Sequence, residues 1–176
     1  MFLKGFKEKS NKKYLNKLLS ERHVNVTSSE VKSLGVVLNI DEYEDIESLK
    51  ALGVFFNVHP NNIKIIAFSE NKSEQLNTWD DCFGPKDFGW KGTINNEVLK
   101  SFLEHEFDVL ISYYKQDQIE LKLVTALSKG KLKVGILQTD ERLNDLIIKT
   151  DIEKFEVFKN ELFKYLKILN KIRNEQ

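Results

Sequence analysis

Short apolar segments that alternate with helical periodicity constrain the fold of this chain more than any other feature. In the first of them Val36, Val37 and Leu38 follow one another, so a strand there would be apolar on both faces. Strands of that kind are typical of sheets covered by helices on both sides. The predicted strands are residues 33–40, 63–69, 107–114, 132–137 and 144–149. Because helical segments separate most of them, they predict a mostly parallel sheet with right-handed crossovers.

The predicted fold class is α/β, a three-layer sandwich with a mostly parallel sheet of about five strands and an N-terminal amphipathic helix. The length of 176 residues suits one domain that buries its own core. We place this domain at residues 31–176 and a basic helical extension at residues 1–22. Within the extension, Ser10 is the predicted N-cap of a helix over 10–22. Phe2, Leu3 and Phe6 could extend the apolar stripe of that helix, with Gly5 as a weak point. The stretch 70–92 is rich in turn residues and is predicted to be a long loop.

Charge is distributed unevenly along a chain whose formal net charge is zero. Residues 1–22 carry seven basic and two acidic side chains, a net charge of +5, so the remainder carries −5. The candidate partner-binding residues are the lysines of this extension, Lys4, Lys7, Lys9, Lys12, Lys13 and Lys17.

Three interpretations of the basic helix stay open. A helix packed on its own domain needs no partner. A membrane-surface helix would place Phe2, Leu3 and Phe6 at the headgroup boundary, with lysines beside them. A helix facing RNA or the ribosome would contact phosphates through its lysines, with a strong dependence on salt.

Composition excludes several classes of protein. Cys82 is the only cysteine, so no intrachain disulfide forms and no zinc-ligand spacing exists. This favours a reducing compartment and a cytoplasmic location. The apolar segments are far shorter than the roughly 20 residues that a membrane-spanning helix needs. The N-terminus also lacks the apolar region of a signal peptide.

No motif with a catalytic or phosphate-binding mechanism is present. Nucleotide sites in parallel sheets need glycines after the first strand, where backbone N–H groups approach a phosphate. Here Asp41, Glu42, Glu44 and Asp45 stand in that position and would repel it. Such acids could hold Mg²⁺, or Asp41 could cap the following helix, and we favour capping. The sequence therefore predicts no catalytic residue, no metal and no cofactor, and it favours a protein that is not an enzyme.

The most unusual stretch, 79–92, combines aromatic, charged and glycine residues after a predicted strand. Loops at the carboxyl ends of parallel strands form the binding crevice of open α/β sheets. One interpretation is a recognition loop, and the other is a loop that its own aromatics tie down over the sheet. The candidate ligand-binding residues are Trp79, Asp80, Lys86, Asp87, Trp90 and Lys91.

Stretches along nearly the whole chain, among them MFLKGFKEKSNKKYLNKLL, KDFGWKG, LVTALSKGKLKVGI and NDLIIKT, resemble a protein family of Bacteroidota, of flavobacterial type, for which no function is established. The resemblance implies a small cytoplasmic bacterial protein and transfers no catalytic residue. Residues 107–137 are also similar to a segment in the N-terminal domains of heptosyltransferase-type glycosyltransferases. That local similarity implies a shared Rossmann-like fold rather than an activity.

The leading functional hypothesis is a non-catalytic binding or adaptor protein. Its partner would be partly anionic, either RNA or the ribosome or a membrane surface, reached through residues 1–22. The alternative is a small-ligand or nucleotide-binding domain, such as a degenerate transferase-like domain, that uses the 79–92 loop.

Overall fold

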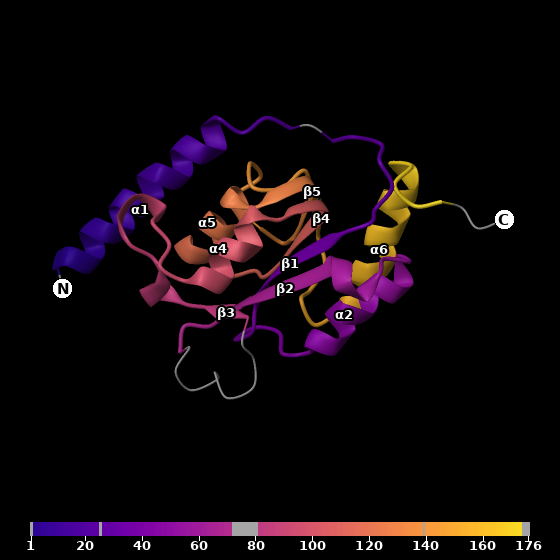
Figure 1. Cartoon of the computed structure of the whole chain (residues 1–176), viewed down its shortest axis with the longest axis horizontal. Coiled ribbons are helices and arrows are strands. Elements are labelled where there is room, and N and C mark those ends of the chain that lie inside the picture. The colour runs from indigo at the N-terminus through magenta and orange to yellow at the C-terminus, as the bar shows by residue number, and fades with distance from the viewer. Residues whose placement is uncertain (1, 25, 72–80, 139, 174–176) are drawn as a thin grey trace.

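A single parallel sheet of six strands organises the molecule (Figure 1). The computed structural model describes residues 2–24, 26–71, 81–138 and 140–173. The strand order is β3-β2-β1-β4-β5-β6, and every neighbouring pair is parallel. The strands are β1 (Leu34–Asn39), β2 (Ile63–Phe68), β3 (Cys82–Phe83), β4 (Glu106–Tyr113), β5 (Lys129–Ile136) and β6 (Leu146–Ile148). This order, which reverses direction between β1 and β4, is the doubly wound order of Rossmann-type sheets.

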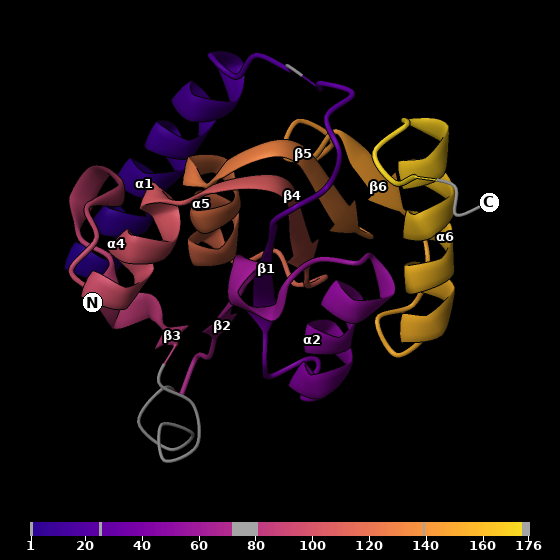
Figure 2. The same cartoon turned by 45° about the vertical axis from the view of Figure 1, so that its right-hand side comes forward.

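Helices cover both faces of the sheet and make it the middle of three layers (Figure 2). On one face lie α2 (Ile46–Phe55) and α6 (Phe155–Ile168), and on the other lie α1 (Phe2–Ser20), α4 (Glu97–Glu104) and α5 (Ile119–Leu127). Short 3₁₀ turns η1 (Pro60–Asn62), η2 (Pro85–Asp87) and η3 (Trp90–Gly92) complete the connections.

Each face of the sheet has its own apolar core. In β1, Val36 and Leu38 face the α2 and α6 layer, while Val37 faces the α4 and α5 layer, and all three side chains are fully buried. Successive side chains of a strand point to opposite faces, so a strand covered on both sides needs apolar residues throughout. The prediction of a three-layer α/β fold with an N-terminal helix is therefore confirmed.

The sheet has one strand more than the sequence indicates. The additional strand β3 lies inside the predicted loop 70–92, where Cys82 pairs with Ala67 and Phe83 with Phe68. Two residues are too few to show the alternation or the apolar run by which strands are recognised. The prediction that all of this segment is loop was therefore wrong at β3.

The N-terminal helix begins eight residues before Ser10, its predicted N-cap. It runs without interruption from Phe2, so Ser10 lies in its interior and is not an N-cap. Gly5 costs a helix only about 1 kcal/mol relative to alanine. Lysines favour the helix, and Glu8 forms an ion pair with Lys12 one turn later (2.7 Å). Among the described residues no helix is long and apolar enough to cross a bilayer.

Candidate functional site

The C-terminal half of α1 is docked on the domain that follows it. Leu15 and Leu19 are buried in the core of the α4 and α5 layer. Asn11 is also buried, and its Oδ1 accepts a hydrogen bond from the backbone N–H of Gly92 in η3 (2.9 Å). One turn earlier, Lys7 Nζ donates to the carbonyl oxygen of Phe88 (3.0 Å). The interpretation of a helix packed on its own domain therefore holds for this half.

Gly92 is the residue that lets the helix approach η3 so closely. Its φ of +70° is in the left-handed region, which favours glycine. A Cβ there would lie 2.5 Å from the ring of Tyr14. The neighbouring Lys91 also has a positive φ of 53°. The turn η3 (Trp90–Gly92), part of the predicted recognition loop, is thus the surface on which α1 docks, and we call it the seat of α1.

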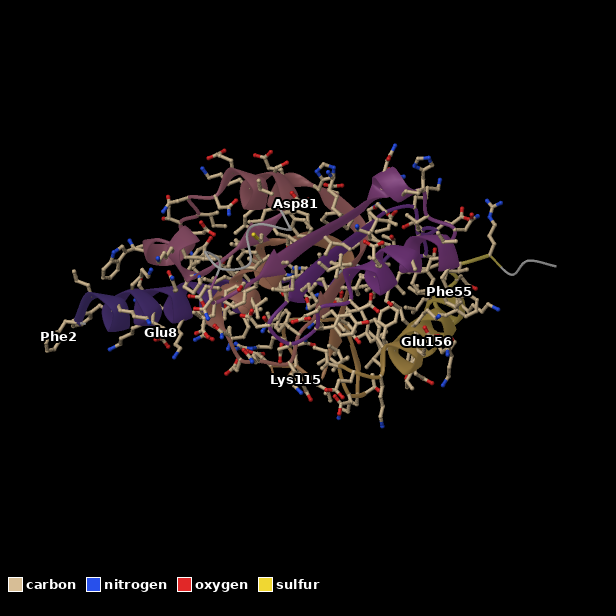
Figure 3. All side chains as sticks on the ribbon, turned by 90° about the horizontal axis from the view of Figure 1, so that it is seen from below. Phe2, Glu8, Phe55, Asp81, Lys115 and Glu156 are labelled. Atoms are coloured by element: carbon tan, nitrogen blue, oxygen red, sulfur yellow. The ribbon has the colours of Figure 1, made fainter. Side chains whose placement is uncertain are left out.

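The opposite face of α1 is turned away from the domain and carries an apolar and basic stripe, which we call the outward face. Its members follow one another at spacings of four, three, four and four residues, which places them on one side of a helix. They are Phe2, Phe6, Lys9, Lys13 and Lys17. Phe2 is 86% exposed and Phe6 is 58% exposed, and Leu3 beside them is 74% exposed. Figure 3 shows Phe2 at the tip of α1, at the end of the molecule opposite Phe55 and Glu156.

The structure divides the six candidate lysines into three groups. Lys9, Lys13 and Lys17 are exposed on the outward face and form no ion pair with any residue the structure describes. Lys12 is held by Glu8, an ion pair that raises the pKa of the lysine and lowers that of the carboxyl. Lys4 and Lys7 line a cleft on the side of the helix that faces the sheet.

That cleft, with a volume of about 1000 Å³, lies between α1 and the carboxyl ends of β2, β3 and β4. We call it the edge cleft. Four segments distant in sequence form its walls, namely the first half of α1, residues 70–71, residues 84–87 and residues 116–120. Its ionisable residues are Lys4, Lys7, Glu8, Glu70, Lys86, Asp87, Asp117 and Glu120.

Several of these charges already have partners in the fold. Asp87 Oδ2 accepts hydrogen bonds from the backbone N–H of Gly84 (2.8 Å) and from Asn96 Nδ2 (3.2 Å). Asp117 forms an ion pair with Lys122 at the outer end of the cleft. These contacts fix the shape of the walls.

Glu120, in the first turn of α5, is half-buried in the edge cleft. Burial raises the pKa of its carboxyl. A hydrogen bond from its own backbone N–H and the charge of Lys7 act to lower that pKa, and the charges of Glu8 and Glu70 raise it further. Lys7, Glu8 and Glu70 are thus each within electrostatic range of Glu120. Neither Glu70 nor Glu120 forms an ion pair with a residue in the described ranges.

The crevice between β1 and β4, where ligands of doubly wound sheets bind, is closed by the acids that follow β1. Glu42 accepts hydrogen bonds from the backbone N–H groups of Lys115 (3.0 Å) and Gln116 (3.1 Å). Asp41 likewise accepts hydrogen bonds from Ser69 Oγ (3.1 Å) and from the backbone N–H of Glu70 (2.9 Å). These backbone N–H groups, which follow β4 and β2, are therefore already satisfied by acids of the loop after β1.

The prediction that Asp41 caps the helix after β1 was wrong. The N-cap of α2 is Asp45, whose Oδ1 accepts the N–H of Ser48 (3.0 Å), because the helix begins at Ile46. Asp41 instead joins the end of β1 to the end of β2. Across the described ranges, no group of three or more side chains is arranged to bind a metal ion.

The four candidate residues of the 79–92 loop that the structure describes lie in two different places. Lys86 and Asp87 line the edge cleft, where they meet Lys4 and Lys7 from the other candidate set. Trp90 is 49% exposed and, with Lys91, belongs to the seat of α1. Trp79 and Asp80 lie outside the described residues.

Sequence reasoning missed the two carboxylates of the edge cleft, Glu70 and Glu120. A signal for them was present, since each follows a strand at its carboxyl end. It could be recognised only once the strand order placed β2, β3 and β4 at the same edge of the sheet.

Fold and site together define a doubly wound parallel α/β protein in which acidic side chains close the crevice between β1 and β4 and a basic helix is docked on the domain. Residues 7–169 match the family of unknown function DUF6913, and the chain belongs to that family. No curated protein and no solved structure matches it.

Proposed function

We propose that this protein is a non-catalytic adaptor that binds an anionic membrane surface through the outward face of α1. One observation carries the proposal. The helix is docked by one side, through Asn11, Leu15 and Leu19, while the stripe from Phe2 to Lys17 faces away from the domain. Docking therefore leaves the basic and apolar stripe accessible.

The chemistry of this face matches the two signals that peripheral membrane binding needs. Apolar side chains insert at the boundary between headgroups and acyl chains, and lysines are attracted to anionic headgroups. Each lysine near an anionic leaflet contributes about 1 kcal/mol. Lys9, Lys13 and Lys17 follow directly behind Phe2 and Phe6 on the same stripe, so both signals act at one surface.

A membrane surface fits the outward face better than RNA does. RNA-binding lysines contact phosphates and need no apolar companions. At the tip of α1, Phe2, Leu3 and Phe6 are the exposed large side chains, and large apolar groups clustered on a surface indicate a partner that buries them. The single buried cysteine and the anionic cytoplasmic leaflet support a cytoplasmic location as part of this proposal.

The second candidate from the sequence was a small-ligand or nucleotide-binding domain. The nucleotide version has little support, because Glu42 and Asp41 occupy the backbone N–H groups at the crevice. The small-ligand version is favoured by a different feature, the edge cleft.

The proposal is tested by co-sedimentation of the full chain with vesicles. Vesicles containing phosphatidylglycerol should retain the protein, and pure phosphatidylcholine vesicles should not. The charge variant replaces Lys9, Lys13 and Lys17 by Glu, and the apolar variant replaces Phe2 and Phe6 by Ser. Because each variant removes one of the two signals, each should bind at least ten-fold more weakly than the wild type.

The matched control replaces three exposed lysines elsewhere, Lys32, Lys115 and Lys149, by Glu. It changes the net charge by the same amount and should bind vesicles like the wild type at any given salt concentration. If the control loses as much binding as the charge variant, net charge alone is responsible and the proposal is wrong. Tight, salt-sensitive binding to homopolymeric RNA without vesicle binding would establish the RNA interpretation instead.

A further inference from the structure

The edge cleft has the place and the size of a ligand site. It opens at the carboxyl ends of the strands, the edge at which open α/β sheets bind ligands. Its volume of about 1000 Å³ is at the upper end of the range typical for small-molecule sites. None of its contacts is needed for membrane binding by the outward face, so the two features are independent.

The lining contains charges of both signs that the fold itself does not neutralise. Among its acids, Glu8 is paired with Lys12, Asp117 with Lys122, and Asp87 accepts two hydrogen bonds. Lys7 donates to the carbonyl of Phe88. Of the remaining ionisable groups, two are cationic and two anionic, and none has an ion-pair partner in the described part of the chain: Lys4, Lys86, Glu70 and Glu120.

The four uncompensated groups come from different elements. Lys4 projects from α1 and Lys86 from η2, whereas Glu70 follows β2 and Glu120 opens α5. Glu120 is half-buried, and its carboxylate takes a hydrogen bond from its own backbone N–H but forms no ion pair in the described part of the chain. A carboxylate withdrawn from water without an opposite charge beside it is unfavourable. A ligand cation placed beside Glu120 would reduce that cost, because it would pair with the carboxylate. Glu70 lies within electrostatic range of Glu120 and adds a second negative charge that attracts such a cation.

We propose that the edge cleft binds a small zwitterionic ligand of the amino-acid class. Glu120 and Glu70 accept hydrogen bonds from its ammonium group, and Lys4 and Lys86 donate to its carboxylate. The side-chain amides of Asn11, Asn71, Gln116 and Gln118 add uncharged donors and acceptors to the lining. A phosphate is disfavoured, because Glu120 already occupies the N-terminal turn of α5.

Two sources share this chemistry, free amino acids and short peptides. Isothermal titration of the full chain with the twenty amino acids, and separately with dipeptides such as Gly-Gly and Ala-Ala, distinguishes them. Binding by either set supports the proposal and identifies the source. Putrescine carries ammonium groups alone and succinate carries carboxylates alone, so each should bind at least ten-fold more weakly than the zwitterion.

Single substitutions test separately the acidic residues that would bind the ammonium group and the lysines that would bind the carboxylate. Glu120→Gln and Lys86→Gln are each expected to weaken binding at least ten-fold while the circular dichroism spectrum stays unchanged. Glu104→Gln, in an exposed position of α4 outside the cleft, is the matched control and should bind like the wild type. The double Phe2 and Phe6 to Ser variant should also bind the ligand normally, so loss of membrane binding and loss of ligand binding are separable.

Three outcomes overturn the proposal. They are no heat of binding with any amino acid or dipeptide at millimolar concentration, putrescine binding as tightly as the best zwitterion, and equal affinity in the Glu120→Gln and Glu104→Gln variants.

Discussion

At the residue scale, Asp108 near the start of β4 connects the backbone before β1 with the side chain of Lys131 in β5. Its Oδ2 accepts the N–H groups of Lys32 (2.9 Å) and Ser33 (3.1 Å), and its Oδ1 is 2.9 Å from Lys131 Nζ. Burial raises the pKa of this carboxyl, but the hydrogen bonds from Lys131 and Lys32 and the charge of Lys131 outweigh burial and lower it. The charged form is thus the one the fold stabilises.

We expect Asp108→Asn to lower the free energy of unfolding by about 2 kcal/mol at pH 7, the magnitude of hydrogen bonds to a charged group. Because the pKa of Asp108 is lower in the folded chain, its contribution is present above the unfolded value of about 4. The contribution is lost as the pH falls through the folded value. Urea unfolding at pH 7 and pH 3 should show the difference between the two proteins shrinking, and an unchanged difference would contradict this account.

Two glycines of α1 and its seat are expected to respond in opposite directions to alanine. Gly92→Ala places a Cβ 2.5 Å from the ring of Tyr14 at a φ of +70°, which we expect to cost about 1–3 kcal/mol. Gly5→Ala meets no atom within 4 Å and lies inside the helix, so it should stabilise by about 1 kcal/mol at most. Thermal unfolding of the two variants checks this pair, and a shift of the same sign in both would be inconsistent with the docked helix.

At the element scale, α1 consists of a docked half and a projecting half. A chain shortened to begin at residue 9 retains the buried residues Asn11, Leu15 and Leu19. The shortened chain loses the hydrogen bond from Lys7 to the carbonyl oxygen of Phe88. A hydrogen bond of this kind contributes about 1 kcal/mol, so the free energy of unfolding should fall by about that amount. Leu15→Ala, in contrast, should cost about 2–4 kcal/mol, because it opens a cavity in the core of the α4 and α5 layer. Denaturant unfolding measures both, and a shortened chain that is the less stable of the two would show that the projecting half is structural.

Sequence patterns predict some of these elements and leave others unrecognised. Strands β1 and β4 are predictable because their apolar residues fill both faces, whereas β3 has only Cys82 and Phe83 and shows no pattern. The helical stripe of Leu15, Leu18 and Leu19 indicates the docked half of α1. The sequence left the extension of the helix to Phe2 open, because Gly5 and the polar residues before Tyr14 interrupt that stripe.

The candidate site was predictable only in its components. The six lysines of α1 are evident from charge, but docking decides which of them faces solvent and which faces the sheet. Lys86 and Asp87 line the same cleft as Lys4 and Lys7, because β3, the strand before them, lies at the edge of the sheet. That contact depends on strand order, which local periodicity does not contain.

At the scale of the whole molecule, the outward face and the edge cleft lie on different sides of one helix. Lys4 and Lys7 face the cleft, while Phe2, Phe6 and Lys9 face away from the domain. The chain can therefore contact a surface through α1 and keep the carboxyl edge of its sheet accessible. The tip of the helix projects beyond the sheet (Figures 1 and 3), so none of the described helices and strands prevents that contact.

Salt should weaken vesicle binding by the outward face more than ligand binding in the edge cleft. Screening weakens attraction between exposed charges, with a Debye length of about 10 Å at 0.1 M and about 3 Å at 1 M. Vesicle binding by the outward face should therefore fall steeply between 0.05 and 0.5 M NaCl, by roughly ten-fold or more. Binding in the half-buried edge cleft should fall less over the same range. A co-sedimentation series and a titration series at matched salt concentrations would test this, and parallel losses would argue against two distinct sites.

The most direct test of the central claim measures the depth of α1 in a bilayer. Gly5→Cys, in a chain whose Cys82 is replaced by Ser, carries a spin label at an exposed position of the projecting half, where a Cβ meets no other atom within 4 Å. With phosphatidylglycerol vesicles, accessibility to oxygen should rise and accessibility to a water-soluble nickel complex should fall. With phosphatidylcholine vesicles neither should change. A label that stays equally accessible to the nickel complex in both cases would contradict membrane binding through the outward face of α1.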